Sequence, residues 1–360
     1  MSLHAVGEVP DADTRSDPAA LVQVGLFRAG PARAFGLGLL LVALAVVALA
    51  SIRYGSRPLS LEAVFDAFTS FDRDLTDHLV VRDQRVPRTL VGLLVGVALG
   101  LSGAVMQGVA RNPLADPGIL GVSAGSALFV VVAIYVFGVT GLLGYVWWAF
   151  AGAAVASVAV YALGALGREG ATPIKLALAG TAVTALCQSV TSAVLVVDVN
   201  TLNQFRFWEA GSLAGRTSEI AGQMAPFIIL GSGMALAAGP SLNALALGDD
   251  VARSLGQRVH LARGFAAVSV VLLVGAATAA AGPIVFVGLV VPHVARAITG
   301  PDYRWVLPYS GVLAAILLLA ADVVGRVVDR PGEVQVGLIT ALVGAPFFIA
   351  LVRRRKLAEL

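Results

Sequence analysis

Few residues of this 360-residue chain could do chemistry, and those few lie near the ends of long apolar runs. The ionisable residues in or beside such runs are Arg88, Lys175, His293, Arg296 and Asp322. Acids and histidines inside a membrane are the usual relays of ion-coupled transport, so Asp322 and His293 are candidates for that chemistry. A simpler interpretation pairs Asp322 with Arg326 one helical turn later and treats His293 as a packed side chain. The sequence leaves both interpretations open.

The patterns that would make the chain an enzyme are missing from the sequence. Neither Lys175 nor Lys356 follows the G-x-x-x-x-G spacing of a phosphate-binding loop. No Ser/His/Asp set, carboxylate pair or metal-ligand spacing is recognisable, and the single cysteine, Cys187, excludes an intramolecular disulfide. We therefore predict no catalytic residue, no metal site and no cofactor bound by this chain. The energy for any transport would then be supplied by another protein.

The elements around these residues must be membrane helices. Hydrophobic residues make up 58% of the chain and charged residues 13%, with a mean hydropathy of +0.87. A soluble domain has about a quarter charged residues, so this much apolar surface needs membrane lipid as its solvent. The net charge of +3 is too small to indicate a nucleic-acid partner.

Runs of about 20 apolar residues, the length that crosses a bilayer, predict an all-α polytopic membrane protein with about ten transmembrane helices. The expected spans are 34–52, 88–110, 117–137, 146–166, 175–197, 220–240, 264–282, 284–299, 305–325 and 334–352. The boundary between the seventh and eighth spans is placed at Gly282-Pro283; if these residues only kink one helix, nine spans result. Gly92, Gly96 and Gly100 indicate close helix packing, within the chain or at a subunit interface.

The two ends of the chain and the charges of its loops suggest an orientation. Residues 1–33 are polar and rich in proline and aspartate, which predicts a disordered tail before a membrane domain at 34–360. Ten spans place both termini on one side, and lysine and arginine are more numerous on that side, residues 353–356 included. By the positive-inside rule both termini, and the loop at about 241–263, are expected in the cytoplasm.

That loop is the most unusual water-facing stretch of the chain. Leu247, Val251 and Leu255 recur every four residues and should share one face of a short helix, while its charged residues point elsewhere. Gly256 suits a left-handed helix end. A helix lying on the lipid surface would favour a basic polar face, and this one carries two aspartates. The alternative is that the helix docks on another protein.

Three blocks of sequence carry a resemblance to a known family. They are RVPRTLVGLLVGVALGLSGAVMQGVARNPLADPGILGVSAG at 85–125, SLNALALGDDVARSLG at 241–256 followed by GPIVFVGLVVPHVAR at 282–296, and ADVVGRVVDRPGEVQVGLITALVGAPFF at 321–348. From about residue 34 to the C-terminus the chain resembles the FecCD family, the transmembrane permease subunits of type II ABC importers for iron-siderophores, haem and cobalamin. The resemblance implies the ten-helix fold of the cobalamin-importer permease, in the bacterial cytoplasmic (inner) membrane.

The resemblance also implies partners. A second permease subunit, identical or related, would complete a central pathway. Two cytoplasmic ABC ATPase subunits would bind ATP and magnesium, and an extracytoplasmic substrate-binding protein would deliver the cargo. In the family, the segment matching 241–263 forms the coupling helices that enter a groove of the ATPase. The residues expected to couple to the ATPase are Leu247, Asp249, Asp250, Val251, Arg253, Leu255 and Gly256.

Further roles follow residue by residue from the family motifs. Arg85, Arg88 and Arg326 match positions that dock the binding protein, a task that suits the arginine fork; the alternative is that they pair with local acids or lipid phosphate. Asn112 and Leu114 match the cytoplasmic gate, although an ordinary turn is the alternative.

The remaining matches are weaker. The second gating point, at about 172–175, departs from the family pattern because it carries Pro173-Ile174. Gln335 stands where the family usually has proline. Spans five and ten should line the pathway, and their faces offer Thr181, Thr184, Gln188 and Thr340.

The expected function is that of a permease subunit of an ATP-driven importer for an iron chelate, with a ferric siderophore as the first choice. Cobalamin or haem import is the alternative within the family. An ion-coupled secondary transporter that uses Asp322 and His293 is the alternative from another class.

Overall fold

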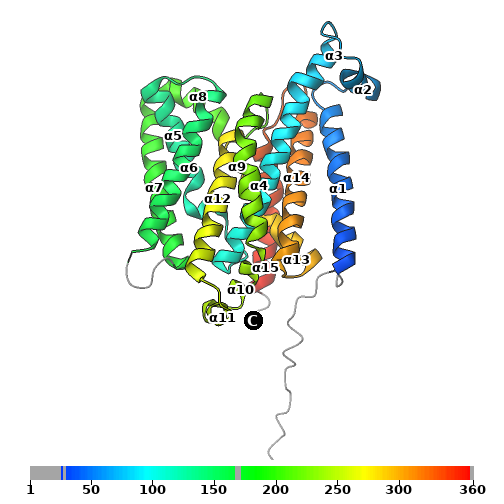
Figure 1. The fold of residues 1–360 in the computed structure, drawn as a ribbon. Helices are drawn as coiled ribbons and strands as arrows, with labels where there is room; N and C mark the ends of the chain where they lie inside the picture. Colours follow the sequence, from blue (N-terminus) through cyan, green and yellow to red (C-terminus); the bar gives the residue numbers. More distant parts are fainter. Residues whose placement is uncertain (1–25, 27–29, 167–171, 357–360) are drawn as a thin grey trace, which may run out of the picture.

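The computed structural model describes residue 26 and residues 30–166 and 172–356, and all regular structure within them is helical (Figure 1). Seven helices are long and apolar enough to cross a membrane. They are α1 (Gly30–Arg53), α4 (Val86–Ala110), α6 (Leu142–Gly164), α7 (Pro173–Val197), α9 (Ser218–Ala237), α12 (Val259–Ala281) and α14 (Tyr303–Val328).

Three shorter apolar helices occupy the remaining expected spans: α5 (Val122–Phe137), α13 (Val287–Thr299) and α15 (Val336–Lys356). The predicted break at Gly282-Pro283 is confirmed, because α12 ends at Ala281 and α13 begins at Val287. Gly282 has φ +77°, a backbone conformation that glycine adopts without steric cost. The expectation of an all-α fold with about ten membrane helices is therefore confirmed.

Helix α4 lies at the centre of the helix bundle. It packs against α14, α12, α9 and α13, while α5, α6 and α7 form a second group that joins the first through contacts between α6 and α12 (Figure 1). A Cβ atom on Gly96 or Gly100 would overlap the backbone of α14 at Ala315 or Ser310. The stripe of glycines thus serves packing within the chain, the first of the two predicted alternatives.

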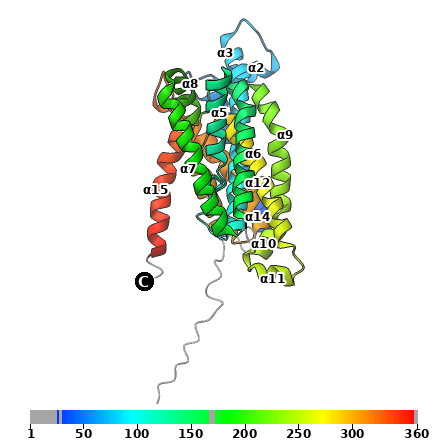
Figure 2. The same ribbon diagram turned by 90° about the vertical axis from the view of Figure 1, so that its left-hand side faces the viewer.

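The two ends of the bundle carry different short helices. At one end, called the α8 end below, lie α2 (Leu61–Thr69), α3 (Thr76–Leu79) and α8 (Val199–Glu209). A π-helical turn, Val80–Arg85, joins α3 to α4 without a break. At the other end, the α11 end, lie α10 (Gly239–Ala246) and α11 (Asp249–Ser254) (Figure 1). The start of α1 and the end of α15 also lie at the α11 end (Figures 1 and 2).

Several predicted boundaries need correction. Residues 1–25 and 27–29 of the expected tail lie outside the described residues, but residues 30–33 already belong to α1, whose first turn accommodates Pro31. The third span begins at Val122 instead of 117, because a 3-10 turn, Pro117–Leu120, precedes it. The hydropathy pattern does not reveal α2 or α8, since both are too short to register as spans.

The loop at 241–263 is not a single helix. It contains α10 and α11, separated at Leu247 and Gly248, where Gly248 has φ +105°. Leu247 and Leu255 are the residues that end the two helices, and only Val251 lies within α11. The four-residue spacing therefore does not define one helical face, because a glycine in a left-handed conformation interrupts it.

Candidate translocation pathway and its two ends

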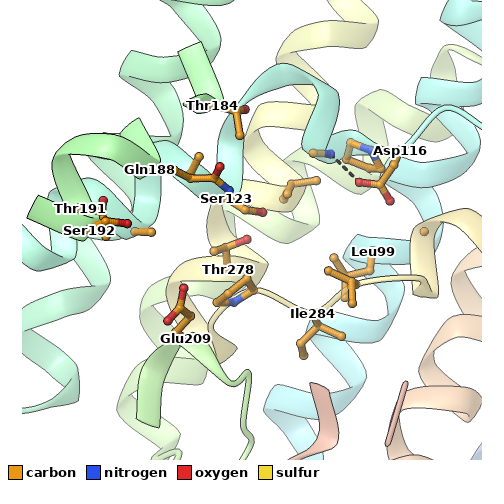
Figure 3. Close-up of a pocket in the computed structure, with 18 of the residues that line it drawn as sticks. Leu99, Asp116, Ser123, Thr184, Gln188, Thr191, Ser192, Glu209, Thr278 and Ile284 are labelled. Atoms are coloured by element: carbon orange, nitrogen blue, oxygen red, sulfur yellow. Dashed lines mark hydrogen bonds between the residues drawn. The ribbon is translucent and has the colours of Figure 1, made fainter. Parts of the chain in front are cut away.

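A cavity of about 580 Å³ lies between α5, α7, α12 and the segment that precedes α13 (Figure 3). Hydroxyl and amide groups line much of it: Ser123, Thr184, Gln188, Thr191, Ser192 and Thr278. Figure 3 shows the side chains from α7 on one side and Leu99, Ile284 and Asp116 on the other. Uncharged polar groups of this kind can contact a bulky solute without holding it tightly, since each contributes only about 0.5–1.5 kcal/mol net.

The predicted wall residues only partly coincide with this cavity. Thr184 and Gln188 line it, as expected for span five. Thr181 lies outside it and donates to the carbonyl of Ala177, one turn back. Thr340 of α15 is buried and donates to the carbonyl of Gly337. None of the described residues of α15 lines this cavity, so the expected contribution of span ten does not appear in the single chain.

Two carboxylates that line the cavity were not predicted from the sequence. The Asp116 carboxylate accepts a hydrogen bond from the backbone N–H of Gly118 at 2.7 Å, and burial raises the pKa of Asp116. Glu209 ends α8, and partial burial raises its pKa as well. Asp116 lies between Ala115 and Pro117, a sequence that resembles an ordinary turn. Glu209 lies on α8, a helix that the sequence did not predict. No sequence pattern therefore marked either residue as part of a cavity.

The turn after α4 has a compact, capped structure. Arg111 ends α4 in the left-handed conformation, with φ 49°. The side-chain oxygen of Asn112 accepts a hydrogen bond from the N–H of Leu114 at 2.9 Å, and the N–H of Ala115 donates to the Asn112 carbonyl at 3.0 Å. Such an Asx turn holds the chain away from helix. The turn leads directly into residues 116–118, which line the large cavity.

The second expected gating point lies close to the first. Asn112 and Ile174 line the same small cavity of about 200 Å³, so the start of α7 and the turn after α4 face each other. The hydroxyl of Thr172 accepts from the N–H of Lys175 at 3.4 Å and caps α7. The structure thus places the two segments together, although the sequence matched the family pattern at only one of them.

The α11 end presents apolar side chains to solvent. Leu247, Val251 and Leu255 are 63%, 44% and 62% exposed. Gly256, with φ +82°, follows α11 in the conformation that the sequence predicted. Arg253 pairs with Asp250 at 2.9 Å on the solvent side.

Asp249 differs from its neighbour Asp250 in its contacts. Its carboxylate contacts Arg111, at the end of α4, at 3.1 Å, and Arg263 of α12 at 2.9 Å. The position predicted as part of the ATPase contact is therefore also a junction between α11, α4 and α12.

At the α8 end, the three arginines predicted to dock a binding protein are engaged within the chain. Arg85 is buried and donates to the carbonyl oxygens of residues 52, 53 and 57. Arg326 is also buried and contacts Asp322 at 2.9 Å and both the carbonyl and the hydroxyl of Ser51. Arg88 lies 2.7 Å from Asp322 and 2.8 Å from Glu333.

These contacts agree with the alternative of local pairing for Arg88 and Arg326, since both contact Asp322. Docking of a binding protein by the three arginines stays a prediction. The guanidinium groups of Arg85 and Arg326 tie α4 and α14 to the end of α1, and only Arg88, through Glu333, approaches the surface. Docking through Arg85 or Arg326 would require breaking buried, charge-assisted contacts, which is costly because it leaves a buried charge without its partners.

Of the two groups proposed for an ion-coupled mechanism, Asp322 forms ion pairs and His293 packs against an aromatic ring. Asp322 is 1% exposed and lies between two arginines, as the simpler interpretation of the sequence expected. His293 packs edge-on against Phe347 of α15, with ring centroids 6.1 Å apart. Within the described residues, no group of three or more His, Cys, Asp or Glu side chains is placed to hold a metal ion.

A cavity with polar lining inside a bundle of membrane-length apolar helices is typical of a membrane transport protein. Residues 42–354 match the FecCD transport family, and the chain belongs to that family.

Known relatives cover nearly the whole chain. It is 41% identical to the ferric enterobactin transport system permease protein FepD of Escherichia coli (strain K12), over 88% of this chain and 94% of the relative. It is 40% identical to the iron(3+)-hydroxamate import system permease protein FhuB of Bacillus subtilis (strain 168), over 90% of this chain and 85% of the relative.

A solved structure described as an inward-facing conformation of a metal-chelate type ABC transporter matches the fold. The TM-score is 0.78 at 30% identity, covering 88% of this chain and 98% of the other. This likeness confirms the fold class and the resemblance that the three sequence blocks indicated.

Proposed function

We propose that this chain is the permease subunit of an ATP-driven importer that carries a ferric siderophore across the cytoplasmic membrane. The observation that carries the proposal is the connection between an internal cavity and an exposed apolar segment at the α11 end. A cavity of about 580 Å³, enough for a bulky solute, lies inside the bundle. An apolar, solvent-exposed segment at the α11 end is joined by an ion pair to the turn below that cavity. The siderophore cargo is supported by relatives named for ferric enterobactin and iron hydroxamate.

The α10–α11 segment is the proposed contact with a cytoplasmic ATPase. Leu247, Val251 and Leu255 would enter a groove of that subunit, and the acidic residues beside them would face its polar rim. Closure of two ATPases on ATP would move the segment as a rigid body and tilt the helices joined to it. ATP and magnesium would be bound by the ATPase, so this chain would contribute no catalytic residue.

The orientation follows from this role. With the ATPase at the α11 end, both ends of the described chain lie in the cytoplasm, and α2, α3 and α8 lie outside (Figure 1). The extracytoplasmic binding protein would dock on the α8 end. We propose Arg88, with its partner Glu333, as the group of the three arginines that takes part in docking, because it is the one that approaches the surface.

The pathway would be completed by a second permease subunit, identical or related. The apolar side chains that α7 and α15 leave exposed support such a contact: Leu178, Leu186, Val190, Leu338, Leu342 and Val343. The turn at Asn112 and Leu114, together with the start of α7, would then narrow the cytoplasmic end.

Reconstitution in liposomes tests the proposal. The chain is incorporated with its ATPase and binding protein, and uptake of radioactive iron as a siderophore complex is measured. We expect uptake to stop when ATP hydrolysis is blocked by vanadate and to persist when ionophores collapse the ion gradients. Uptake that survives vanadate and stops with the ionophores would instead identify an ion-coupled secondary transporter.

A further inference from the structure

A second cavity, of about 360 Å³, lies at the α8 end and is separate from the large one. We call it the Arg216 pocket, and its lining residues are Tyr145, Gln204, Trp208, Ser212, Ala214, Arg216, Glu333 and Gln335. They come from the start of α6, from α8 and the segment after it, and from the segment between α14 and α15. Trp208 and Glu209 are consecutive residues, and they line the Arg216 pocket and the large cavity respectively. The C-terminus of α8 therefore separates the two cavities.

Arg216 is the unusual residue of this pocket. Its side chain is 6% exposed, yet within the described part of the chain it makes no hydrogen bond and no ion pair, and its Nε is among the buried atoms without a partner. Burial, and to a smaller extent the nearby positive charge of Arg88, lowers the pKa of Arg216 to about 10. At neutral pH Arg216 is therefore charged. Burying such a charge without a counter-ion is strongly destabilising.

A second unpaired donor lies in the same wall. Trp208 is 2% exposed, and its indole Nε1–H has no acceptor in the described structure. Two neighbouring hydroxyl groups already have partners: the Tyr145 hydroxyl donates to the side-chain oxygen of Gln204 at 2.9 Å, and the Ser212 hydroxyl accepts from the N–H of Ala214 at 3.1 Å. The unmet demand of this pocket is thus for an acceptor, and specifically for a negatively charged one.

The charges around the pocket lead to the same conclusion. Four arginines gather at this end, Arg85, Arg88, Arg216 and Arg326, and the coulombic influence of one on the next links them. The acids near them are Asp77, Asp322 and Glu333; Asp77 pairs with Arg57, and the other two pair with Arg88 or Arg326. Among residues 30–166 and 172–356, no acid pairs with Arg216.

The size of the pocket decides what kind of anion fits. A volume of about 360 Å³ falls within the range of small-molecule sites, roughly 300–1,000 Å³. One aspartate or glutamate side chain from a docked protein would leave most of it empty. Glu333, which also lines the pocket, adds an acceptor that suits a hydroxyl group of the ligand. The lining therefore fits an organic molecule that carries both carboxylate and hydroxyl groups.

We propose that the Arg216 pocket binds the carboxylate of a small hydroxycarboxylate, the carboxylate arm of the iron chelate that this transporter carries. Arg216 and Trp208 would donate hydrogen bonds to the carboxylate oxygens, and Glu333 would accept from a hydroxyl. The pocket would hold an anionic chelate at the mouth of the pathway, beside the large cavity. Only the source of the carboxylate rests on the proposed function; the anion site stands on the pocket itself.

Calorimetry on the full-length permease in lipid nanodiscs, with citrate as the probe, tests the site. We expect wild-type protein to bind citrate, and Arg216→Gln to weaken binding at least about tenfold, as the loss of a charge-assisted contact predicts. Arg206→Gln, which removes the same charge from an exposed position on α8, is the matched control and should bind like wild type. Trp208→Phe keeps most of the packing and removes one N–H, so it should weaken binding about two- to tenfold even if Arg216→Gln fails to fold.

Three results would overturn the proposal: no citrate binding to wild type, unchanged binding in the folded Arg216→Gln protein, or equal loss in the Arg206→Gln control. A fourth would do so as well, namely that citrate does not bind while Arg216→Gln abolishes association with the binding protein, because the carboxylate would then be a side chain of that partner. These isotherms use the permease alone. Their outcome therefore does not depend on whether the chain supports ATP-driven uptake.

Uptake experiments then test the source of the carboxylate. In liposomes that hold the complete transporter, Arg216→Gln should reduce uptake of a ferric hydroxycarboxylate chelate by about tenfold and leave uptake of a chelate without carboxylates unchanged. Equal uptake of both chelates by Arg216→Gln and wild type would overturn the assignment to the cargo.

Discussion

The carboxylate of Asp249 lies 3.1 Å from the guanidinium of Arg111, so the first residue of α11 is held against the residue that ends α4. Arg263 of α12 contacts the same carboxylate at 2.9 Å. Arg111 immediately precedes the capped turn at Asn112, and that turn leads into the wall of the large cavity. A displacement of α11 can thus reach the floor of the pathway through one ion pair.

This relationship predicts uncoupling when Asp249 loses its charge. In the reconstituted transporter, Asp249→Asn should leave ATP hydrolysis close to wild type and reduce the iron transported per ATP by at least about fivefold, the effect of losing a coupling free energy of about 1 kcal/mol. Glu62→Gln is the control, because it neutralises an exposed acid on α2, at the α8 end and away from the proposed ATPase contact. Equal transport per ATP in both variants would show that the ion pair does not transmit the movement.

Substitution of the exposed apolar residues at the α11 end is expected to prevent binding of the ATPase. Replacing Leu247, Val251 and Leu255 together with serine should abolish copurification of the ATPase, because each buried anchor contributes about 1.5–3 kcal/mol. The protein should still insert, since these side chains are exposed in the single chain. Leu61→Ser, at an exposed position of α2 on the opposite end, is the control. Copurification of the ATPase with the triple variant would remove α10–α11 from the interface.

The buried acid at the α8 end predicts a stability effect. Asp322→Asn removes the counter-charge of both Arg88 and Arg326, and breaking a buried pair in this way costs about 3–5 kcal/mol. The melting temperature of the purified protein should fall by about 5 °C or more. Asp329→Asn, an exposed position beyond the end of α14, should melt like wild type. A melting temperature unaffected by Asp322→Asn would mean that this network adds little stability.

The contacts of the α4 glycines predict that larger side chains are not tolerated at these positions. Gly100→Leu should lower the melting temperature and the yield of folded protein, because its Cβ would overlap the Ser310 carbonyl group and force α4 and α14 apart. Gly38→Leu on α1 has open space around the Cβ position and should be tolerated. Thermal unfolding followed by tryptophan fluorescence compares the two. If both variants unfold at the same temperature as wild type, the close approach of α4 and α14 is not required.

The sequence alone established the membrane class, the positions of the ten spans, the break at Gly282-Pro283 and the family. These depend on the length of apolar runs, on the backbone freedom of glycine and proline, and on ordered motifs. All are local properties, which a chain displays before it folds. The left-handed conformation at Gly256 was predictable for the same reason.

Local spacing misled the prediction where a single residue changed the backbone. Leu247, Val251 and Leu255 follow a helical period, yet the left-handed Gly248 divides the segment into two helices. The apolar side chains remain exposed, so the predicted surface exists although the predicted helix does not.

Only the tertiary structure decided which charges are free. Arg88 finds its partner Asp322 at a distance of 234 residues along the chain, and Arg85 is satisfied by carbonyl groups at the end of α1. From the sequence, these arginines and Arg216 look alike, as cations at the ends of helices. Folding buries Arg85 and Arg216 and leaves Arg88 partly exposed. In the described part of the chain it supplies acceptors to Arg85 and Arg88 but not to Arg216, because pairing depends on which helix ends meet in space.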